Sequence, residues 1–252
     1  MKILITNDDG LHAPGLIPLI QWAQKLGQVT AIVPKYEQSG KSQGIELHKA
    51  FEVKTAELAP SITVTSVDST PADCIRYAIL GLQEKFDLVI SGINRGLNMG
   101  TDMQYSGTVG AVLESGHLGV PAIALSTSPS AYDRAASQLD AVWEFFQVHK
   151  LLKLHNLYNV NIPADAKGIR ITRQGGPYYS DDFVPEEDHK VSPCGKEVYV
   201  PTADMNIDTN AVLQGGYISI MPLTLQKTDM HIYQSLLHLN DNPCNSKLQR
   251  IY

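Results

Sequence analysis

Two adjacent carboxylates, Asp8 and Asp9, follow a short apolar run at the start of the chain. The run at 2–6 has the length and apolar character of a buried parallel strand. In open α/β sheets, ligands bind beyond the carboxyl ends of the strands. Neighbouring carboxylates repel each other unless a positive charge lies between them, and a hard divalent cation suits this position. The Asp-Gly dipeptide at 9–10 is also common in turns, but a turn needs only one Asp, and we favour the metal interpretation.

A glycine-rich segment at 91–100 follows another predicted strand, at 87–91. Glycines at a strand end allow the backbone to approach a ligand closely. Asn94 lies in this segment and offers a carbonyl oxygen to a metal or an N–H to a phosphate oxygen. On its own the segment is weak support for either site.

Ser106, Gly107 and Thr108 stand at the start of a predicted helix. Hydroxyls and free backbone N–H groups at a helix start can bind an anion, and the helix dipole favours this. Ordinary N-capping by Ser106 or Thr108 would use the same residues, and the two roles are compatible.

A polar loop at 34–42 contains Ser39 and ends in Gly-Lys-Ser, which resembles the end of a P-loop. A P-loop requires a glycine five residues before Gly40, where this chain has Lys35. The P-loop interpretation therefore fails, and the segment remains a loop with hydroxyl ligands at a strand end.

The elements that position these segments alternate between strand and helix over the first 165 residues. The strands are predicted at 2–6, 28–33, 62–67, 87–91, 122–126 and 157–162. The helices are predicted at 16–26, 72–82, 107–118 and 133–150. This alternation indicates a doubly wound, mostly parallel sheet with helices on both faces.

Capping residues mark the start of the second helix. Thr70 suits the N-cap, Pro71 the first helical position and Asp73 the first turn. We therefore assign Asp68 and Asp73 structural rather than catalytic roles.

The pattern changes after residue 166. Strands are predicted at 169–172, 197–200 and 217–221, with a long loop or arm over 175–193 and a weak apolar stretch at 232–239. We predict one domain over 1–252, in which about 166–252 form a C-terminal extension with a β-hairpin and an oligomerisation arm.

Composition limits the partners. The chain has 252 residues, 26 acidic and 20 basic, for a formal charge of -6, which argues against binding a nucleic-acid polymer. The apolar run at 2–6 is too short for a secretion signal, and no stretch approaches the roughly 18 apolar residues of a membrane span. We expect a cytoplasmic protein without a membrane partner, whose three cysteines are ordinary thiols.

Taken together, these segments resemble the SurE family of survival proteins, which are 5′/3′-nucleotidases. Seven stretches match in the family order between residues 3 and 223: ILITNDDG, QSGKSQGI, VDSTPADCIRYAI, DLVISGINRGLNMG, YSGTVGAVLESGHLGVPAIALS, NVNIP and GGYISIMPL. The stretch at 207–211 matches only loosely.

The resemblance implies a metal site of Asp8, Asp9, Ser39 and Asn94 that holds one divalent cation per subunit. It also implies phosphate contacts from Asn94 and from Ser106, Gly107 and Thr108, and a catalytic role for Asp8, Asp9 and Asn94. The substrates it implies are nucleoside 5′- and 3′-monophosphates, with short polyphosphate in some members. It further implies homodimers or homotetramers that exchange C-terminal segments.

An all-oxygen ligand set suits Mg²⁺ or Mn²⁺ better than zinc, and we expect in-line attack on phosphorus by an activated water.

Three alternatives remain open. A phospho-acceptor receiver domain also has an acidic pair after its first strand, but it is about half as long and would have a Lys after the strand at 122–126, where Ser126-Thr127-Ser128 stand. A zinc-dependent deacetylase would have a His beside the pair, where this chain has Asn7. A nucleotide-binding module would show no turnover.

Overall fold

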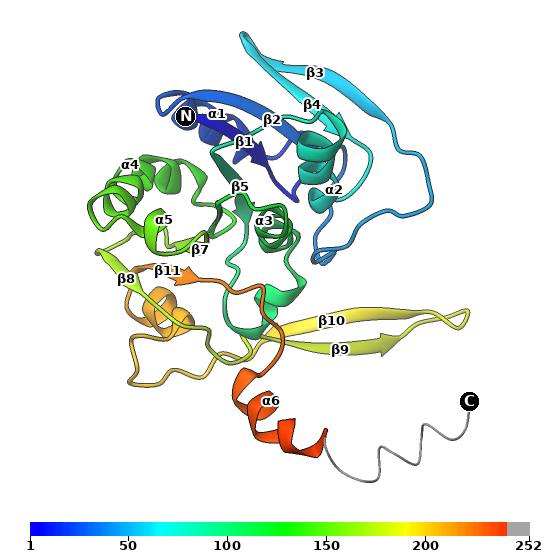
Figure 1. Ribbon diagram of the computed structural model, residues 1–252. Helices are drawn as coiled ribbons and strands as arrows, with labels where there is room; N and C mark the ends of the chain where they lie inside the picture. Colours follow the sequence, from blue (N-terminus) through cyan, green and yellow to red (C-terminus); the bar gives the residue numbers. More distant parts are fainter. Residues whose placement is uncertain (241–252) are drawn as a thin grey trace.

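A nine-stranded sheet runs through the centre of the protein, as seen in a computed structural model that describes residues 1–240 (Figure 1). The strand order across the sheet is β3-β4-β2-β1-β5-β6-β7-β11-β8. These strands are β1 (Lys2–Thr6), β2 (Gln28–Pro34), β3 (Val53–Ala59), β4 (Ile62–Val67), β5 (Leu88–Arg95), β6 (Ala122–Thr127), β7 (Leu157–Ile162), β8 (Ile169–Ile171) and β11 (Ile218–Pro222). All six strands predicted for the first 165 residues are present.

The sheet is parallel at its centre and has two antiparallel pairs, β3 with β4 and β7 with β11. Strand β1 pairs in parallel with β2 on one side and with β5 on the other. On the β2 side of β1, strand β4 pairs with β2. On the β5 side, strand β6 pairs with β5 and β7 pairs with β6. The order thus reverses between β1 and β5, where the carboxyl ends of a doubly wound sheet leave a crevice for ligands.

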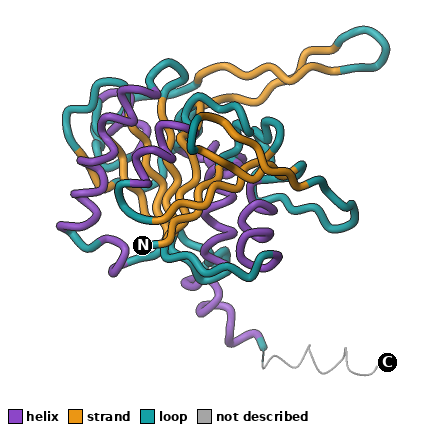
Figure 2. The backbone as a smooth tube through the Cα atoms, turned by 90° about the horizontal axis from the view of Figure 1, so that it is seen from above, coloured by secondary structure: helices purple, strands orange, loops and turns teal. Residues whose placement is uncertain are grey.

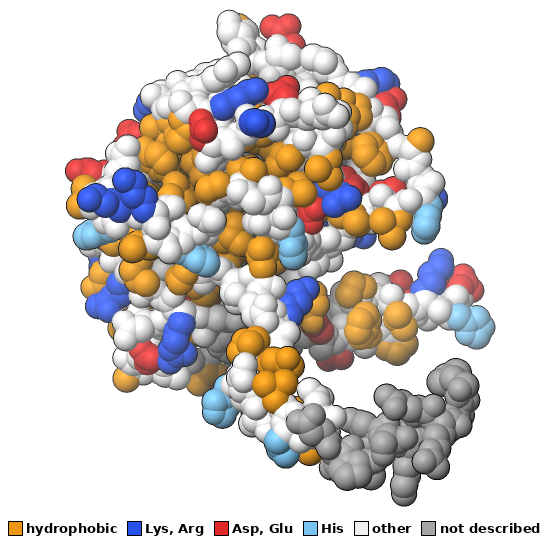
Figure 3. All heavy atoms as spheres, in the orientation of Figure 1, with side chains coloured by type: hydrophobic (Ala, Val, Ile, Leu, Met, Phe, Trp, Pro, Cys, Tyr) orange, Lys and Arg blue, Asp and Glu red, His pale blue; other side chains and the backbone are white. Residues whose placement is uncertain are grey.

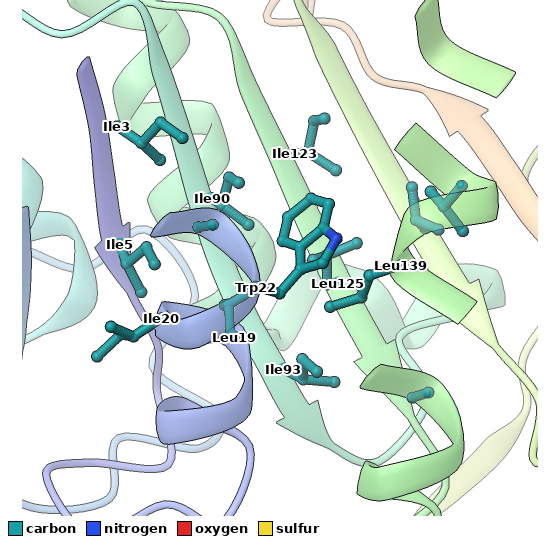
Figure 4. Packing of buried hydrophobic residues seen from close by; sticks show 14 of the residues in the cluster. Ile3, Ile5, Leu19, Ile20, Trp22, Ile90, Ile93, Ile123, Leu125 and Leu139 are labelled. Atoms are coloured by element: carbon teal, nitrogen blue, oxygen red, sulfur yellow. The ribbon is translucent and has the colours of Figure 1, made fainter. Parts of the chain in front are cut away.

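Helices cover both faces of the sheet, which confirms the predicted fold class (Figure 2). Helices α1 (Leu16–Gln24) and α4 (Tyr132–Val148) pack on one face, and α2 (Pro71–Arg76) and α3 (Gly107–His117) on the other. Figure 4 shows the first of these cores, where Leu19 and Trp22 of α1 lie over the isoleucines of the sheet. The central strands therefore bury side chains on both faces, as their continuous apolar sequences predict. No helix in residues 1–240 is both long and apolar enough to cross a lipid bilayer.

The predicted start of α2 is confirmed. The Thr70 side chain accepts a hydrogen bond from the backbone N–H of Asp73 at 3.1 Å, and Pro71 is the first helical residue. The Asp73 carboxylate accepts bonds from the Glu46 N–H and the Ser69 hydroxyl, at 2.8 and 2.5 Å. Asp73 is thus engaged in local structure. The helix predicted over 72–82 continues beyond α2 as one π-helical turn, η1 (Tyr77–Gly81).

Two edge elements differ from the prediction. Strand β3 was not predicted, because its alternating exposed and half-buried residues lack a continuous apolar run; it pairs antiparallel with β4 at the edge of the sheet. The run predicted as a long loop or arm at 175–193 contains most of an antiparallel hairpin, β9 (Tyr179–Pro185) and β10 (Val191–Glu197), which confirms the β-hairpin predicted for the C-terminal region but not its placement. The strand predicted at 197–200 was wrong, since β10 ends at its first residue. Nearly all residues of this hairpin are exposed, and its apolar residues do not form a regular alternation, so neither strand shows a buried apolar face in sequence.

The C-terminal region has one part inside the main sheet and one part outside it. Strand β11 pairs antiparallel with β7, and β8 pairs with β11, so both extend the sheet. The hairpin and helix α6 (Met230–Leu236) project from the body, and hydrophobic side chains gather on both (Figures 1 and 3). The remaining short elements are η2 (Gly100–Tyr105), α5 (Leu151–Leu154), η3 (Asn210–Gln214) and η4 (Leu237–Leu239). The last part of the predicted arm, 241–252 with Cys244, lies outside the described residues.

Candidate metal and phosphate site

The turn after β1 is formed by Asn7, which leaves both aspartates free for other roles. The Asn7 side chain donates to the Gly10 carbonyl at 3.0 Å and accepts from the Gly10 N–H at 3.2 Å. Gly10 has φ +88°, and a Cβ there would lie 2.9 Å from the Tyr36 carbonyl carbon. Glycine is therefore required at this position, and Asn7 supplies the turn chemistry that the sequence had allowed for Asp9.

Asp8 lies in the interior, with 3% of its surface exposed. Its carboxylate accepts a hydrogen bond from the Thr108 hydroxyl at the start of α3. Burial raises the pKa of Asp8, and the bonds from the Thr108 hydroxyl and from the backbone N–H groups of Thr108 and Gly107 oppose that rise. A buried carboxylate without a countercharge is costly, so the site favours a cation here.

Gly107 brings the start of α3 into close contact with Asp8. A Cβ on Gly107 would lie 2.8 Å from the Asp8 Cβ and 3.0 Å from its Oδ2. The Gln38 N–H donates to the Asp8 carbonyl at 2.7 Å, which places the loop after β2 beside the same strand end. Ser39 follows in this loop, and its hydroxyl donates to Glu37 at 2.9 Å. The loop therefore brings a hydroxyl and a third carboxylate near the aspartate pair.

Asp9 is held against the end of β5. Its Oδ2 accepts the Arg95 backbone N–H at 2.8 Å. Burial raises the pKa of Asp9 to about 6, and the charges of Asp8 and Glu37 add to the rise, while the Arg95 N–H opposes it. The charges of the two aspartates and of Glu37 thus act on one another at the end of β1.

Asn94 lies in β5 itself, whereas the sequence placed it in a loop after a strand ending at 91. The strand continues because its pairing with β6 shifts register between Ser91 and Asn94, at Gly92, whose φ of +142° suits glycine. The Asn94 Nδ2 donates to the Gly96 carbonyl at 2.8 Å. No group in residues 1–240 donates to its Oδ1, which leaves the carbonyl oxygen as the free ligand atom.

Ser106 caps α3 by accepting the Val109 N–H at 3.1 Å. Of the two capping candidates, Ser106 is therefore the N-cap, and Thr108 instead binds Asp8. The helix start faces the aspartate pair through Gly107 and Thr108. A phosphate held beside a cation at this pair would meet the positive end of the helix dipole.

The residues present fit a divalent cation. Within residues 1–240, no Lys, Arg or His forms an ion pair with Asp8 or Asp9, although the charge of Arg95 acts from a greater distance to lower the pKa of Asp9. The same part of the chain has no cluster of three or more His, Cys, Asp and Glu side chains that could hold a metal. The candidate donors expected from the sequence are two carboxylates, a hydroxyl and an amide oxygen, a set that would suit Mg²⁺ or Mn²⁺, which prefer oxygen ligands.

The structure also identifies contacts that the sequence did not reveal. The Arg95 backbone N–H holds Asp9, and the negative charge of Glu37 raises the pKa of Asp9. Glu37 lies two residues before Ser39 in the same loop, so its presence near the site could have been predicted from the sequence. The backbone contact carries no signal in sequence.

Comparisons with known proteins place the chain in a family. The sequence profile described as "Survival protein SurE" matches residues 3–181. A protein named 5′-nucleotidase SurE from Thermoanaerobacter sp. (strain X514) is 36% identical, covering 94% of this chain and 97% of the relative. Proteins of the same name from Syntrophotalea carbinolica and Legionella pneumophila subsp. pneumophila are 37% and 34% identical, covering 94% and 97% of this chain and 96% and 99% of the relatives. The crystal structure of the SurE protein from Aquifex aeolicus aligns with a TM-score of 0.74 at 30% identity, covering 96% of this chain and 100% of that one.

Proposed function

Since the chain belongs to the survival protein SurE family, we propose that it hydrolyses nucleoside 5′- and 3′-monophosphates to nucleoside and phosphate with one divalent cation per subunit. The observation that carries the proposal is the buried Asp8 beside Asp9, at the point where the strand order reverses, with no ion-pair partner for either carboxylate within residues 1–240. Relatives that align over nearly their whole length are named 5′-nucleotidases. The receiver-domain and deacetylase alternatives have no such support.

The proposed ligands of the cation are Asp8, Asp9, Ser39 and Asn94. When bound, Mg²⁺ or Mn²⁺ supplies Lewis acidity that neutralises phosphoryl charge and lowers the pKa of water. Ser39 reaches this role by exchanging its present bond to Glu37, and Asn94 offers its free carbonyl oxygen.

The chain's own groups orient the substrate and accept a proton. The start of α3, with Ser106, Gly107 and Thr108, and the side chain of Asn94 bind the phosphoryl oxygens, where negative charge collects in the transition state. One of the two aspartates accepts the proton of the attacking water. Asp8, Asp9 and Asn94 are therefore the proposed catalytic residues. The same phosphoryl site would accept the end of a short polyphosphate.

We also propose a homodimer or homotetramer that exchanges C-terminal segments. The hairpin exposes Phe183, Val184 and Val191 by 51–62%, and an isolated two-stranded ribbon is marginally stable in water. Helix α6 has no buried residue in the single chain, and Ile232 and Leu236 are about half exposed. Apolar surfaces of this kind mark protein contacts. Light scattering should give at least a dimer, and Phe183→Asp should shift the mass toward a smaller species; a monomer for the unchanged protein would contradict this proposal.

The test of the proposed activity is a panel of nucleoside monophosphates and tripolyphosphate, assayed with Mg²⁺, Mn²⁺ or a chelator. Asp9→Asn removes one proposed ligand, so we expect turnover to fall by about 100-fold or more, beyond the 10–100-fold typical of losing an indirect metal contact. Asp165→Asn is the matched control, because Asp165 is 86% exposed by its side chain and pairs only with Arg134 at the surface. Unchanged turnover in a folded Asp9→Asn variant, or full activity in chelator, would contradict the proposal.

A further inference from the structure

A cavity of about 430 Å³ lies beside the candidate site. Residues 96–97, 128–129 and 178–179 form its walls, together with Asp102 of η2. Gly96, the first of the lining residues, lies two residues after Asn94. The Asn94 side chain donates a hydrogen bond to the Gly96 carbonyl at 2.8 Å. A group in the cavity would therefore be adjacent to a phosphate bound at Asn94. Cavities of this size hold small ligands.

The walls of the cavity are fixed by hydrogen bonds from several strands. The Gly96 N–H donates to the Thr127 carbonyl at 2.8 Å, which joins the loop after β5 to the loop after β6. Two residues further on, the Asn98 N–H and side chain bond to Asn161 and Ser126, at 2.7 and 2.8 Å. The cavity is thus formed before any ligand binds, which lowers the entropic cost of binding.

The two tyrosines are positioned through their backbone. The Asp102 carboxylate accepts the N–H groups of Tyr178 and Tyr179 at 2.8 and 2.6 Å, which fixes the base of the hairpin against η2. The two rings lie 5.9 Å apart at 60°, and Tyr179 is 49% exposed. Aromatic surface is therefore available to a ligand in this cavity.

The chemistry of the lining favours a flat, uncharged group. Leu97, Pro129 and the tyrosine rings supply apolar surface, and Ser128 supplies a hydroxyl. None of the lining residues is a Lys or Arg, and one is the carboxylate Asp102. A second phosphate would meet no cation here, whereas a nucleobase would find rings on which to stack.

We propose that this cavity is the nucleoside subsite of the enzyme, in which the base of the substrate stacks against Tyr178 and Tyr179. This inference rests on the proposed phosphomonoesterase function and names the part of the molecule that recognises the nucleoside. Stacking depends on the ring face, which every base has. The subsite therefore selects nucleotides over other phosphate esters and accepts all common bases.

The test compares a double variant, Tyr178→Ala with Tyr179→Ala, with the corresponding double Phe variant. Both keep the backbone N–H groups that Asp102 holds, so the hairpin anchor is preserved, and only the Ala variant loses the rings. The substrates are AMP and CMP against ribose 5-phosphate, which has the same phosphate and sugar without a base. A second measurement compares the inhibition constants of the two products, adenosine, which has a base, and inorganic phosphate, which has none.

In the Ala variant we expect KM for both nucleotides and the inhibition constant of adenosine to rise by about tenfold or more, within the range of one lost base–aromatic stack. The Phe variant should behave as the unchanged protein. The kinetics of ribose 5-phosphate and the inhibition by phosphate should stay within about twofold, since neither ligand reaches the rings. An equal loss for nucleotides and ribose 5-phosphate, or no loss for either, would overturn the inference.

Different measurements test the nucleoside subsite and the proposed phosphomonoesterase function. If the unchanged protein cleaves no phosphate ester, the proposed function is wrong, and calorimetry of adenosine with the unchanged protein and the Ala variant still decides the subsite. Adenosine binding that the Ala variant loses supports the subsite; equal binding, or none to the unchanged protein, rejects it.

Discussion

The hydroxyl of Thr108 donates a hydrogen bond to the carboxylate of Asp8 across a separation of 100 residues. The bond joins the first turn of α3 to the end of β1. It opposes the rise in the Asp8 pKa that burial causes, so this bond favours the ionised form of the carboxylate. A proposed metal ligand is in this way supported by a residue that the sequence suggested only for phosphate binding or capping.

Thr108→Val should weaken cation binding, because the nearly isosteric Val leaves Asp8 without its hydroxyl donor. We expect Mn²⁺ affinity, measured by calorimetry near neutral pH, to fall by about 10–100-fold, as for other groups that orient metal ligands. Thr108→Ser keeps the hydroxyl and should remain within a few-fold of the unchanged protein. Equal Mn²⁺ affinity in the Val and Ser variants would show that the bond is dispensable.

Gly107→Ala should displace Asp8, since the added methyl would lie 2.8 Å from the Asp8 Cβ. Overpacking of this kind costs about 1–3 kcal/mol, and the movement should lower both Mn²⁺ affinity and turnover. Gly176→Ala is the matched control, because a Cβ there meets no atom within 4 Å. The relation between α3 and Asp8 would be disproved by a Gly107→Ala protein with unchanged turnover and melting temperature.

The stabilising effect of a divalent cation should depend on pH. In the cation-free protein the pKa of Asp9 is raised from 3.8 to about 6, so the folded state holds its proton more tightly than the unfolded state. The free energy of unfolding therefore falls as pH rises between these two values, because the Asp9 carboxyl loses its proton less readily in the folded state than in the unfolded state. Mn²⁺ should raise the melting temperature more at about pH 7.5, where the carboxylate is ionised, than at about pH 5, where protons compete with the metal. A shift of equal size at both pH values would exclude Asp9 as a ligand.

Asp208 should be important for stability. Its fully buried carboxylate accepts the N–H groups of Gly100 and Gly175 at 2.8 Å and that of Thr209 at 2.7 Å. Asp208→Asn replaces one acceptor oxygen by a donor that faces a backbone N–H, and leaving that group unsatisfied should cost about 1–3 kcal/mol in the free energy of unfolding.

Asp204→Asn provides the comparison for Asp208, because its pair with Arg173 is largely exposed and should change stability by less than about 1 kcal/mol. Both variants can be measured by urea unfolding. The importance of Asp208 is contradicted if the two lose similar amounts.

Much of the fold was predictable because the central strands are buried on both faces. Their apolar runs, and the helix start at Thr70, follow from local rules, and both are confirmed. The edge elements follow no such rule. Strand β3 and the hairpin β9–β10 consist of exposed and half-buried residues, so their pairing depends on neighbours that periodicity does not reveal.

The candidate site was predictable in its residue types, since polar side chains at neighbouring strand ends must come together. The structure does place Asp8, Asp9 and Asn94 at the ends of adjacent strands β1 and β5. The contacts within the site could not be predicted from the sequence. The extension of β5 to Arg95 depends on the backbone at Gly92, and the bond from Thr108 to Asp8 depends on how α3 packs.

The most direct test of the metal site is a crystal structure with Mn²⁺ in which the anomalous signal locates the ion. The account predicts one strong peak per subunit, within coordination distance of Asp8, Asp9, Ser39 and Asn94, and loss of this peak in Asp9→Asn. A peak elsewhere, or none at this site in crystals of a protein whose hydrolysis requires Mn²⁺, would contradict it.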